Sequence, residues 1–170
     1  TNNPPLPFRC YRIGQVFRGE NPQKGRWREF TQMDPDTVGS TDLTEDAKII
    51  AAVIKAIRAV GVANPVMAIN DRKNFDGLDK NVMIAVDKLD KIGDDGVIRE
   101  MVSKGIGEKD AKRTLEEVKN KKPTADLEQI FSNLKDLGVN EDEYEFVPTL
   151  ARGLDYYTGA IFELRAPSYG

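Results

Sequence analysis

The order of apolar and polar residues predicts a β-hairpin near the start of the chain. From Phe8 to Phe17 the residues alternate in character with a period of two, which is typical of a strand. The stretch GENPQKG supplies turn residues, and the alternation resumes from Arg26 to Met33. Two alternating runs around such a stretch predict an antiparallel pair with a long connection.

A helix and a short strand are predicted next. Asp42 with Glu45 three residues later forms a capping-box pattern, which predicts a helix start. Apolar residues then recur at helical spacing until Gly61, which is expected to end the helix. These apolar residues are Leu43, Ala47, Ile50, Ala51, Ile54 and Ile57. A strand is expected around Val66 to Ile69.

Four short charged helices are predicted in the middle of the chain. Their sequences are NVMIAVDKLDKI, GVIREMVSKGI, EKDAKRTLEEVKN and ADLEQIFSNLKDLG. Strand patterns return from Tyr144 to Leu150 and from Tyr156 to Leu164. We therefore expect an α+β fold with a largely antiparallel sheet and a projecting helical insert. The predicted division is a first core segment over residues 1–77, the insert over 78–140 and a second core segment over 141–170.

Composition excludes several kinds of chemistry. The chain has 170 residues, 31% of them charged, a net charge of −3 and a pI near 5.2, which argues against nucleic-acid binding through bulk basicity. Cys10 is the only cysteine and there is no histidine, so an internal disulfide, a thiolate metal site and imidazole catalysis are excluded. No apolar run approaches the roughly 20 residues of a membrane helix, and the start does not resemble a signal peptide, so a cytoplasmic protein with no membrane partner is expected. Both ends suggest a fragment of a longer protein.

Positive charge is concentrated in the predicted hairpin. Residues 1–33 carry six basic side chains against two acidic ones, which leaves +4 there and −7 elsewhere. On a strand Arg26, Arg28, Phe30 and Gln32 would share a face, and Arg18 would lie near Arg26 across the hairpin. Arginines without an acidic partner favour an anion such as phosphate, and an adjacent ring can stack on a base. The alternative is a set of solvated surface arginines beside a core aromatic; neither GxxxxGK[ST] nor GxGxxG is present.

A second candidate stretch is LARGLDYYTGAIFE, residues 150–163. A glycine on each side of Tyr156 and Tyr157 is consistent with a close backbone approach to a ligand, with hydroxyl groups available for hydrogen bonds. The alternative is an ordinary strand with aromatic packing.

Together the two stretches resemble a known family. FRGENPQKGRWREFTQMD resembles motif 2 of the class II aminoacyl-tRNA synthetases, specifically of the histidyl-tRNA synthetases, and LARGLDYYTGAIFE resembles that family's histidine signature. The resemblance covers most of residues 8–77 and 141–164, and the middle is similar to the family's helical insertion domain. It implies a class II synthetase-like antiparallel sheet flanked by helices.

The resemblance implies an ATP site on the hairpin. Arg18 matches the arginine that holds the α-phosphate and the substrate carboxylate. Glu20 matches the acid near the adenine, Arg26 the residue that reaches the γ-phosphate, and Phe30 the ring stacked on adenine. Mg²⁺ would bridge the outer phosphates of ATP. No residue of the chain is assigned to a metal.

The resemblance also implies a histidine pocket and two catalytic arginines, Arg18 and Arg152. The residues expected to contact histidine are Arg18, Gln32, Asp36, Arg152, Tyr156 and Tyr157. The implied activity is that of a histidine–tRNA ligase, which joins L-histidine to the acceptor end of tRNA(His) at the expense of ATP. Since a carboxylate is already a nucleophile at neutral pH, the first step needs no general base, which agrees with the absence of histidine.

Several elements of the family pattern do not occur in these 170 residues. Motif 1, motif 3, the anticodon-binding domain and an acidic stretch before motif 2 are missing. We therefore expect the fragment alone to be inactive and the full-length protein to be a homodimer. Two alternatives stay open: a non-catalytic module that binds tRNA, and a regulatory paralogue in histidine biosynthesis. The insert's basic residues are a candidate acceptor-stem contact or a solvated helix face.

Overall fold

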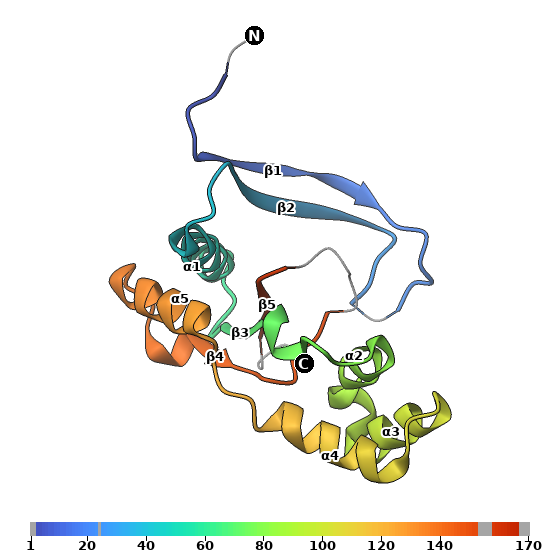
Figure 1. Ribbon diagram of the computed structural model, residues 1–170. Helices are drawn as coiled ribbons and strands as arrows, with labels where there is room; N and C mark the ends of the chain where they lie inside the picture. Colours follow the sequence, from blue (N-terminus) through green and yellow to red (C-terminus); the bar gives the residue numbers. More distant parts are fainter. Residues whose placement is uncertain (1–2, 24, 153–157, 167–170) are drawn as a thin grey trace.

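The computed structural model describes residues 3–23, 25–152 and 158–166. Its strands form two separate sheets (Figure 1). Strands β1 (Phe8–Phe17) and β2 (Glu29–Val38) form an antiparallel hairpin. Strands β3 (Val66–Asp71), β4 (Tyr144–Phe146) and β5 (Ala160–Arg165) form the second sheet, in the order β4-β3-β5. β3 pairs in parallel with β4 and antiparallel with β5, so the second sheet is mixed.

The hairpin agrees with the prediction in its first strand and is displaced in its second. β2 begins at Glu29 rather than Arg26 and continues to Val38. Arg26 forms only an isolated bridge with Gln23. The prediction that Arg26 and Arg28 share a strand face with Phe30 and Gln32 is therefore wrong, because both arginines precede β2. Half-buried Phe30 and Gln32 do alternate with exposed neighbours, as a strand requires.

One hydrophobic core lies between the second sheet and two helices. Helix α1 (Leu43–Ala59) begins after Asp42, whose Oδ1 accepts a hydrogen bond from the amide of Thr44 at 2.8 Å. Its apolar side packs against α5 (Ala125–Asp136) and against β3. The buried members are Ala47, Ile50, Ala51, Ile54, Met67, Ile69, Leu127, Ile130, Leu134 and Val139. Each large side chain buried here contributes about 1.5–3 kcal/mol to folding.

The other helices form a separate core below the second sheet (Figure 1). They are α2 (Lys80–Val86), α3 (Leu89–Ser103) and α4 (Glu108–Lys119). The sequence NVMIAVDKLDKI, expected as one helix, is divided between α2 and α3, and a further kink occurs inside α3 at Gly93, where φ is 65°. A positive φ is a conformation that glycine adopts without strain, so the kink falls at this residue.

Helix α5 lies within the range that the sequence assigns to the insert. In the structure its apolar side packs on α1, while α2, α3 and α4 pack on one another. The contacts of α5 are thus with the core, although the boundaries of the insert remain a prediction. Two short 3₁₀ helices complete the fold, η1 (Arg72–Phe75) and η2 (Glu141–Glu143).

The final strands are shorter than predicted. β4 ends at Phe146 rather than Leu150, because the chain turns there through a hydrogen bond from the amide of Leu150 to the carbonyl of Val147. β5 begins at Ala160, and the earlier residues of the predicted strand, up to 157, lie outside the described residues. Among the described segments of the chain, no helix combines the length and apolar character that crossing a membrane requires.

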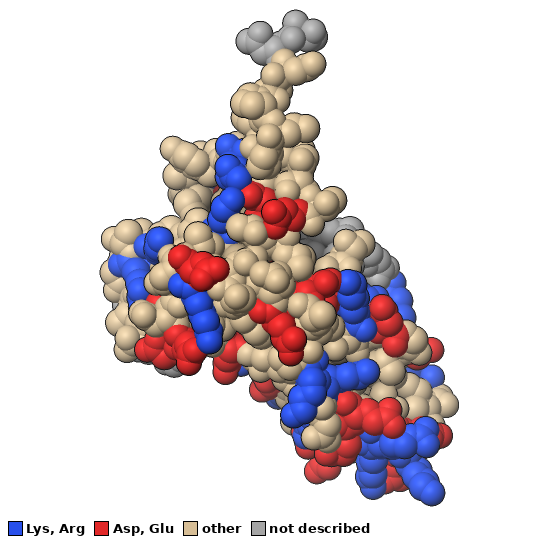
Figure 2. Space-filling view, turned by 60° about the vertical axis from the view of Figure 1, so that its left-hand side comes forward, with Lys and Arg blue, Asp and Glu red and all other residues tan. Residues whose placement is uncertain are grey.

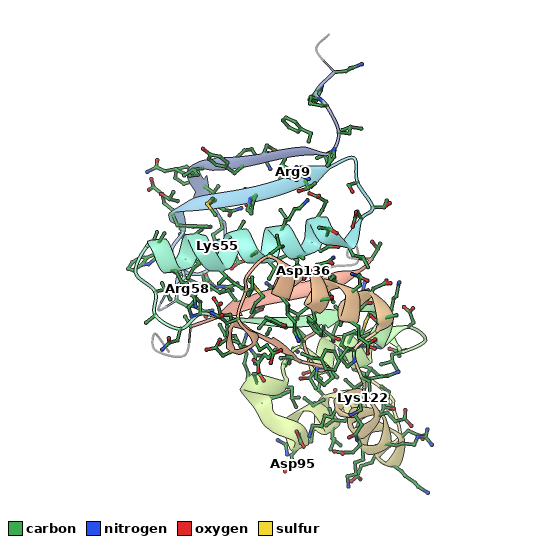
Figure 3. All side chains as sticks on the ribbon, turned by 90° about the vertical axis from the view of Figure 1, so that its left-hand side faces the viewer. Arg9, Lys55, Arg58, Asp95, Lys122 and Asp136 are labelled. Atoms are coloured by element: carbon green, nitrogen blue, oxygen red, sulfur yellow. The ribbon has the colours of Figure 1, made fainter. Side chains whose placement is uncertain are left out.

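The hairpin is fastened to α1 by an ion pair (Figure 3). Arg9 on β1 contacts Glu45 in the first turn of α1 through two hydrogen bonds, Nε–Oε2 at 2.6 Å and Nη2–Oε1 at 2.7 Å. Lys48 Nζ adds a third contact to Glu45 Oε1 at 2.8 Å. Hydrogen bonds from Arg9 and then from Lys48 stabilise the carboxylate and lower the pKa of Glu45 to about 2.

This contact predicts a loss of stability in acid. Because the pKa of Glu45 falls from 4.5 to about 2 on folding, its contribution is complete above 4.5 and is lost as the pH falls towards 2. Replacing Glu45 by glutamine should therefore make the melting temperature less sensitive to pH across this interval. Thermal denaturation followed by circular dichroism, with Glu117→Gln on the exposed side of α4 as the control, measures the difference. Equal pH dependence in the natural chain and in Glu45→Gln would contradict the assignment.

Candidate active site

Arg18 lies at the turn end of the hairpin, directly after β1, and faces an aromatic ring. Its amide donates to the carbonyl of Arg28 at 2.9 Å, so Arg18 lies opposite Arg28. The sequence pattern instead predicts that Arg18 lies near Arg26. Its guanidinium carbon lies 4.0 Å from the centroid of the Phe30 ring. This is a cation–π contact, and it places a cation and a stacking surface side by side.

An acidic residue, Glu20, accompanies the other arginines of the loop. Arg26 Nη1 lies 3.2 Å from Glu20 Oε2, and Arg28 Nε donates to the Glu20 backbone carbonyl at 3.1 Å. The prediction that no acid lies between the arginines is therefore wrong. Since both side chains of the Arg26–Glu20 pair are more than half exposed, the pair contributes only about 0–1 kcal/mol and leaves the arginine able to change partner.

Gln32 and Asp36 are each held by a neighbour on the hairpin. Gln32 Nε2 donates to Asp34 Oδ1 at 2.6 Å, and Arg12 Nη2 donates to Asp36 Oδ2 at 3.2 Å. Asp36 also lines a cavity of about 290 Å³ that includes Phe162 on β5. The structure thus brings this predicted histidine contact to the space between the two sheets.

Arg152 belongs to the segment that leads towards β5. Its Nη2 lies 3.4 Å from Glu163 Oε2, and both side chains are 44% exposed. Arg18 and Arg152 thus have different partners, and their convergence on one ligand stays a prediction. Tyr156 and Tyr157, the remaining predicted contacts, lie outside the described residues.

Two acids near the second sheet were not predicted from the sequence. Burial, followed by the nearby charge of Glu45, raises the pKa of Asp46 on α1. Asp71 is buried at the end of β3, where it accepts hydrogen bonds from the amide of Lys73 and the hydroxyl of Thr124. Both line a cavity of about 300 Å³. The polar pair Asn70 and Asp71, which follows the apolar run from Val66 to Ile69, was the signal in the sequence that would have identified Asp71.

Another cavity, of about 440 Å³, lies between the hairpin and α1 and is mainly apolar. Of the predicted site residues that the structure describes, only Asp36 lines it. This cavity therefore does not locate the predicted ATP site, which depends on Arg18, Arg26 and the Phe30 ring near the turn of the hairpin.

Taken together, these arginines are suited to binding an anion. Arg18, Arg26 and Arg152 are described with partners that are weak or partly exposed. A planar guanidinium can exchange such a partner for phosphate or carboxylate oxygens, to which it donates two parallel hydrogen bonds. The Phe30 ring offers a surface for a base.

The family agrees with this chemistry. Residues 1–125 match the family described as tRNA synthetase class II core domain (G, H, P, S and T). The chain therefore belongs to the class II tRNA synthetase core-domain family, and the resemblance identified in the sequence is confirmed.

Its relatives include histidine–tRNA ligases. The enzyme of that name from Flavobacterium johnsoniae is 38% identical over 95% of this chain and 40% of the relative. The one from Helicobacter pylori strain P12 is 36% identical over 93% of this chain and 43% of the relative. The chain thus spans well under half the length of these relatives.

Solved structures confirm the α+β fold. The crystal structure of histidyl-tRNA synthetase from Nostoc sp. PCC 7120 has a TM-score of 0.81 at 24% identity, covering 99% of this chain and 46% of that one. A second, titled ATP phosphoribosyltransferase regulatory subunit/histidyl-tRNA synthetase from Bacillus halodurans C, has a TM-score of 0.71 at 17% identity, over 96% and 49%. At these identities the likeness concerns the fold alone.

Proposed function

We propose that this chain belongs to a histidine–tRNA ligase, which activates L-histidine with ATP and transfers it to tRNA(His). The observation that carries the proposal is the similarity to histidine–tRNA ligases over 93–95% of the chain. The half-buried pair of Arg18 and Phe30 and the half-exposed Arg152 supply side chains of the required kinds. Because the chain spans about 40% of its relatives, the complete activity belongs to the full-length ligase that carries this sequence.

The first step joins the histidine carboxylate to the α-phosphorus of ATP. The attacking carboxylate oxygen forms the new P–O bond, and the bond to the departing pyrophosphate breaks. Arg18 and Arg152 would stabilise the negative charge that accumulates on the α-phosphate oxygens. Glu20, Arg26 and Phe30 would orient ATP.

Selection of histidine would rest on polar partners for the imidazole ring. Gln32, Asp36, Tyr156 and Tyr157 are the proposed partners. A pocket built to hydrogen-bond a substrate rejects analogues that leave its polar groups unpaired. The acyl group then passes from the adenylate to the 3′ end of the tRNA.

Mg²⁺ would enter with ATP. Within the ranges that the structure describes, no group of three or more histidine, cysteine, aspartate or glutamate side chains is placed to hold a metal ion. In nucleotide sites Mg²⁺ is commonly bound by phosphate oxygens and water, with one or two carboxylates.

Dimer formation and a cytoplasmic location also belong to the proposal, whereas contact of the insert with the acceptor stem is the less favoured of two alternatives. On the face shown in Figure 2, basic and acidic side chains are interleaved at the lower end, which carries the insert helices. Lys112 pairs with Glu108, Arg113 with Asp110, and Lys119 with Asp94. This pairing favours a solvated helix face over a strong nucleic-acid patch.

Histidine-dependent exchange of pyrophosphate into ATP by the full-length ligase tests the proposed function. We expect exchange with L-histidine and none above background with other amino acids. The reason is that only the imidazole ring of histidine would form hydrogen bonds with all the polar groups of the proposed pocket. Absence of exchange, together with binding of tRNA, would instead favour a non-catalytic synthetase-like module, and absence of both would favour a regulatory paralogue.

A further inference from the structure

A small polar cavity lies where the insert meets β5. It has a volume of about 50 Å³ and lies between the α2–α3 junction and the end of β5. A cavity of this size can hold water beside charged groups. The charged side chains that line it are Asp87, Asp90, Glu163 and Arg165.

Two ion-pair systems cross this junction. Arg165 contacts Asp90 at the start of α3 at 3.2 Å and Glu145 on β4 at 3.3 Å. Arg152 contacts Glu163 on β5 at 3.4 Å. The two systems lie on the same stretch of β5, because Glu163 and Arg165 are two residues apart and share a face of the strand.

Asp87 lies on the insert side of this cavity, opposite the strand that pairs with Arg152. It is the C-terminal cap of α2, and it lines the cavity together with Glu163, which contacts Arg152 at 3.4 Å. Asp87 is therefore next to the partner of Arg152. In agreement with this placement, burial raises the pKa of Asp87, and the positive charge of Arg152 acts in the opposite direction. Lys88 and Lys91 are the other cations that act on Asp87.

We infer that Asp87 and Glu163 are positioning residues for Arg152, one from the insert and the other from β5. The inference rests on the proposed role of Arg152 at the α-phosphate. Glu163 holds the guanidinium directly, and Asp87 favours its position at the junction by charge. Because the Glu163 pair is half exposed, Arg152 can exchange it for phosphate when ATP binds.

A consequence is that the insert and the reaction centre are connected electrostatically. Movement of α2 relative to β5 changes the distance from Asp87 to Arg152. The charge that Arg152 offers to the α-phosphate then depends on the position of the insert. If the junction had only a structural role, substitutions in it would change the stability of the protein without changing its turnover.

The test uses three charge-removing variants of the full-length ligase: Asp87→Asn, Glu163→Gln and, as a matched control, Asp90→Asn. Asp90 lines the same cavity but contacts Arg165. We expect Asp87→Asn and Glu163→Gln to lower kcat of histidine-dependent exchange about threefold to tenfold, the usual size of an interaction between neighbouring residues. The KM for ATP should stay within about twofold of its normal value. Asp90→Asn should stay within about twofold of the natural enzyme in both.

Coupling to Arg152 is tested in an Arg152→Gln background, which removes the positive charge. If Asp87 and Glu163 act through this arginine, their substitutions should have no further effect there. The inference is overturned if Asp87→Asn matches Asp90→Asn, or if its full effect persists beside Arg152→Gln. Asp87→Glu should restore kcat if charge is what matters, and circular dichroism identifies any variant that has lost its fold.

A second measurement is independent of activity. Phenylglyoxal modifies accessible arginines, and mass spectrometry of the peptide containing Arg152 gives the rate at that residue. We expect faster modification in Asp87→Asn and Glu163→Gln than in Asp90→Asn, because the guanidinium is less restrained. If the full-length ligase shows no exchange, the proposed function fails, and this rate alone decides: a rise supports the positioning of Arg152, and unchanged rates overturn it.

Discussion

Replacing Arg152 by alanine in the full-length ligase is expected to lower histidine-dependent ATP–pyrophosphate exchange by about 10²–10³-fold, the usual effect of removing one donor to a transition-state charge. Its folding should hardly change. The Glu163 contact is half exposed at 3.4 Å, and such pairs contribute about 0–1 kcal/mol. Exchange kinetics and thermal denaturation measure the two effects.

The matched control for this result is Arg113→Ala. Arg113 is an exposed arginine on α4 that contacts Asp110 at 2.7 Å, so its loss removes an ion pair of similar kind away from the proposed centre. Exchange should then remain close to normal. An Arg152→Ala enzyme with near-normal exchange would refute the catalytic role, whereas a large fall in its melting temperature would point to a structural one.

Replacing Ile130 by alanine is expected to destabilise this chain by about 2–5 kcal/mol, since it removes buried methyl and methylene groups and leaves a cavity. Ile130 is fully buried on α5, in the core shared with α1 and β3. Urea denaturation of the chain, monitored by circular dichroism, gives the free energy of unfolding.

Val60→Ala provides the comparison. Val60 follows α1 and its side chain is 75% exposed, so its truncation should change the free energy of unfolding by no more than about 0.5 kcal/mol. If Ile130→Ala proved as mild as Val60→Ala, the buried packing of Ile130 between α5 and α1 would be wrong.

Periodicity predicted most helices because it reflects which side of an element is buried. The apolar repeat beginning at Leu43 and the cap at Asp42 define α1 closely. Periodicity does not say which neighbour covers the apolar side. For that reason the sequence groups α5 with the insert helices that precede it, although Leu127, Ile130 and Leu134 pack on α1.

The second hairpin strand is displaced for a different reason. Alternation from Arg26 to Met33 is compatible with many extended conformations, and Pro35 argues against a longer strand. Proline is tolerated where a strand has an unpaired edge, and both strands of this hairpin have one within the described residues. β2 therefore includes Pro35 and continues to Val38.

The sequence indicated which residues would form the candidate site, but it did not indicate which side chains would form ion pairs with one another. The sequence placed Arg18 and Phe30 on the same hairpin, and the structure brings the guanidinium of Arg18 over the Phe30 ring. It missed Glu20 as the partner of Arg26 and Glu163 as the partner of Arg152. Side-chain ion pairs depend on rotamers and on the approach of distant segments, which local patterns do not encode.

The hairpin has a further consequence for how this protein must be handled. Across the segments that the structure describes, each of its strands has one edge whose backbone amides and carbonyls face no other strand. An isolated two-stranded ribbon is marginally stable in water, and bare edges promote intermolecular pairing. The side chains proposed to bind ATP thus lie on a two-stranded ribbon, whose rigidity would increase if a further strand paired with one of these edges.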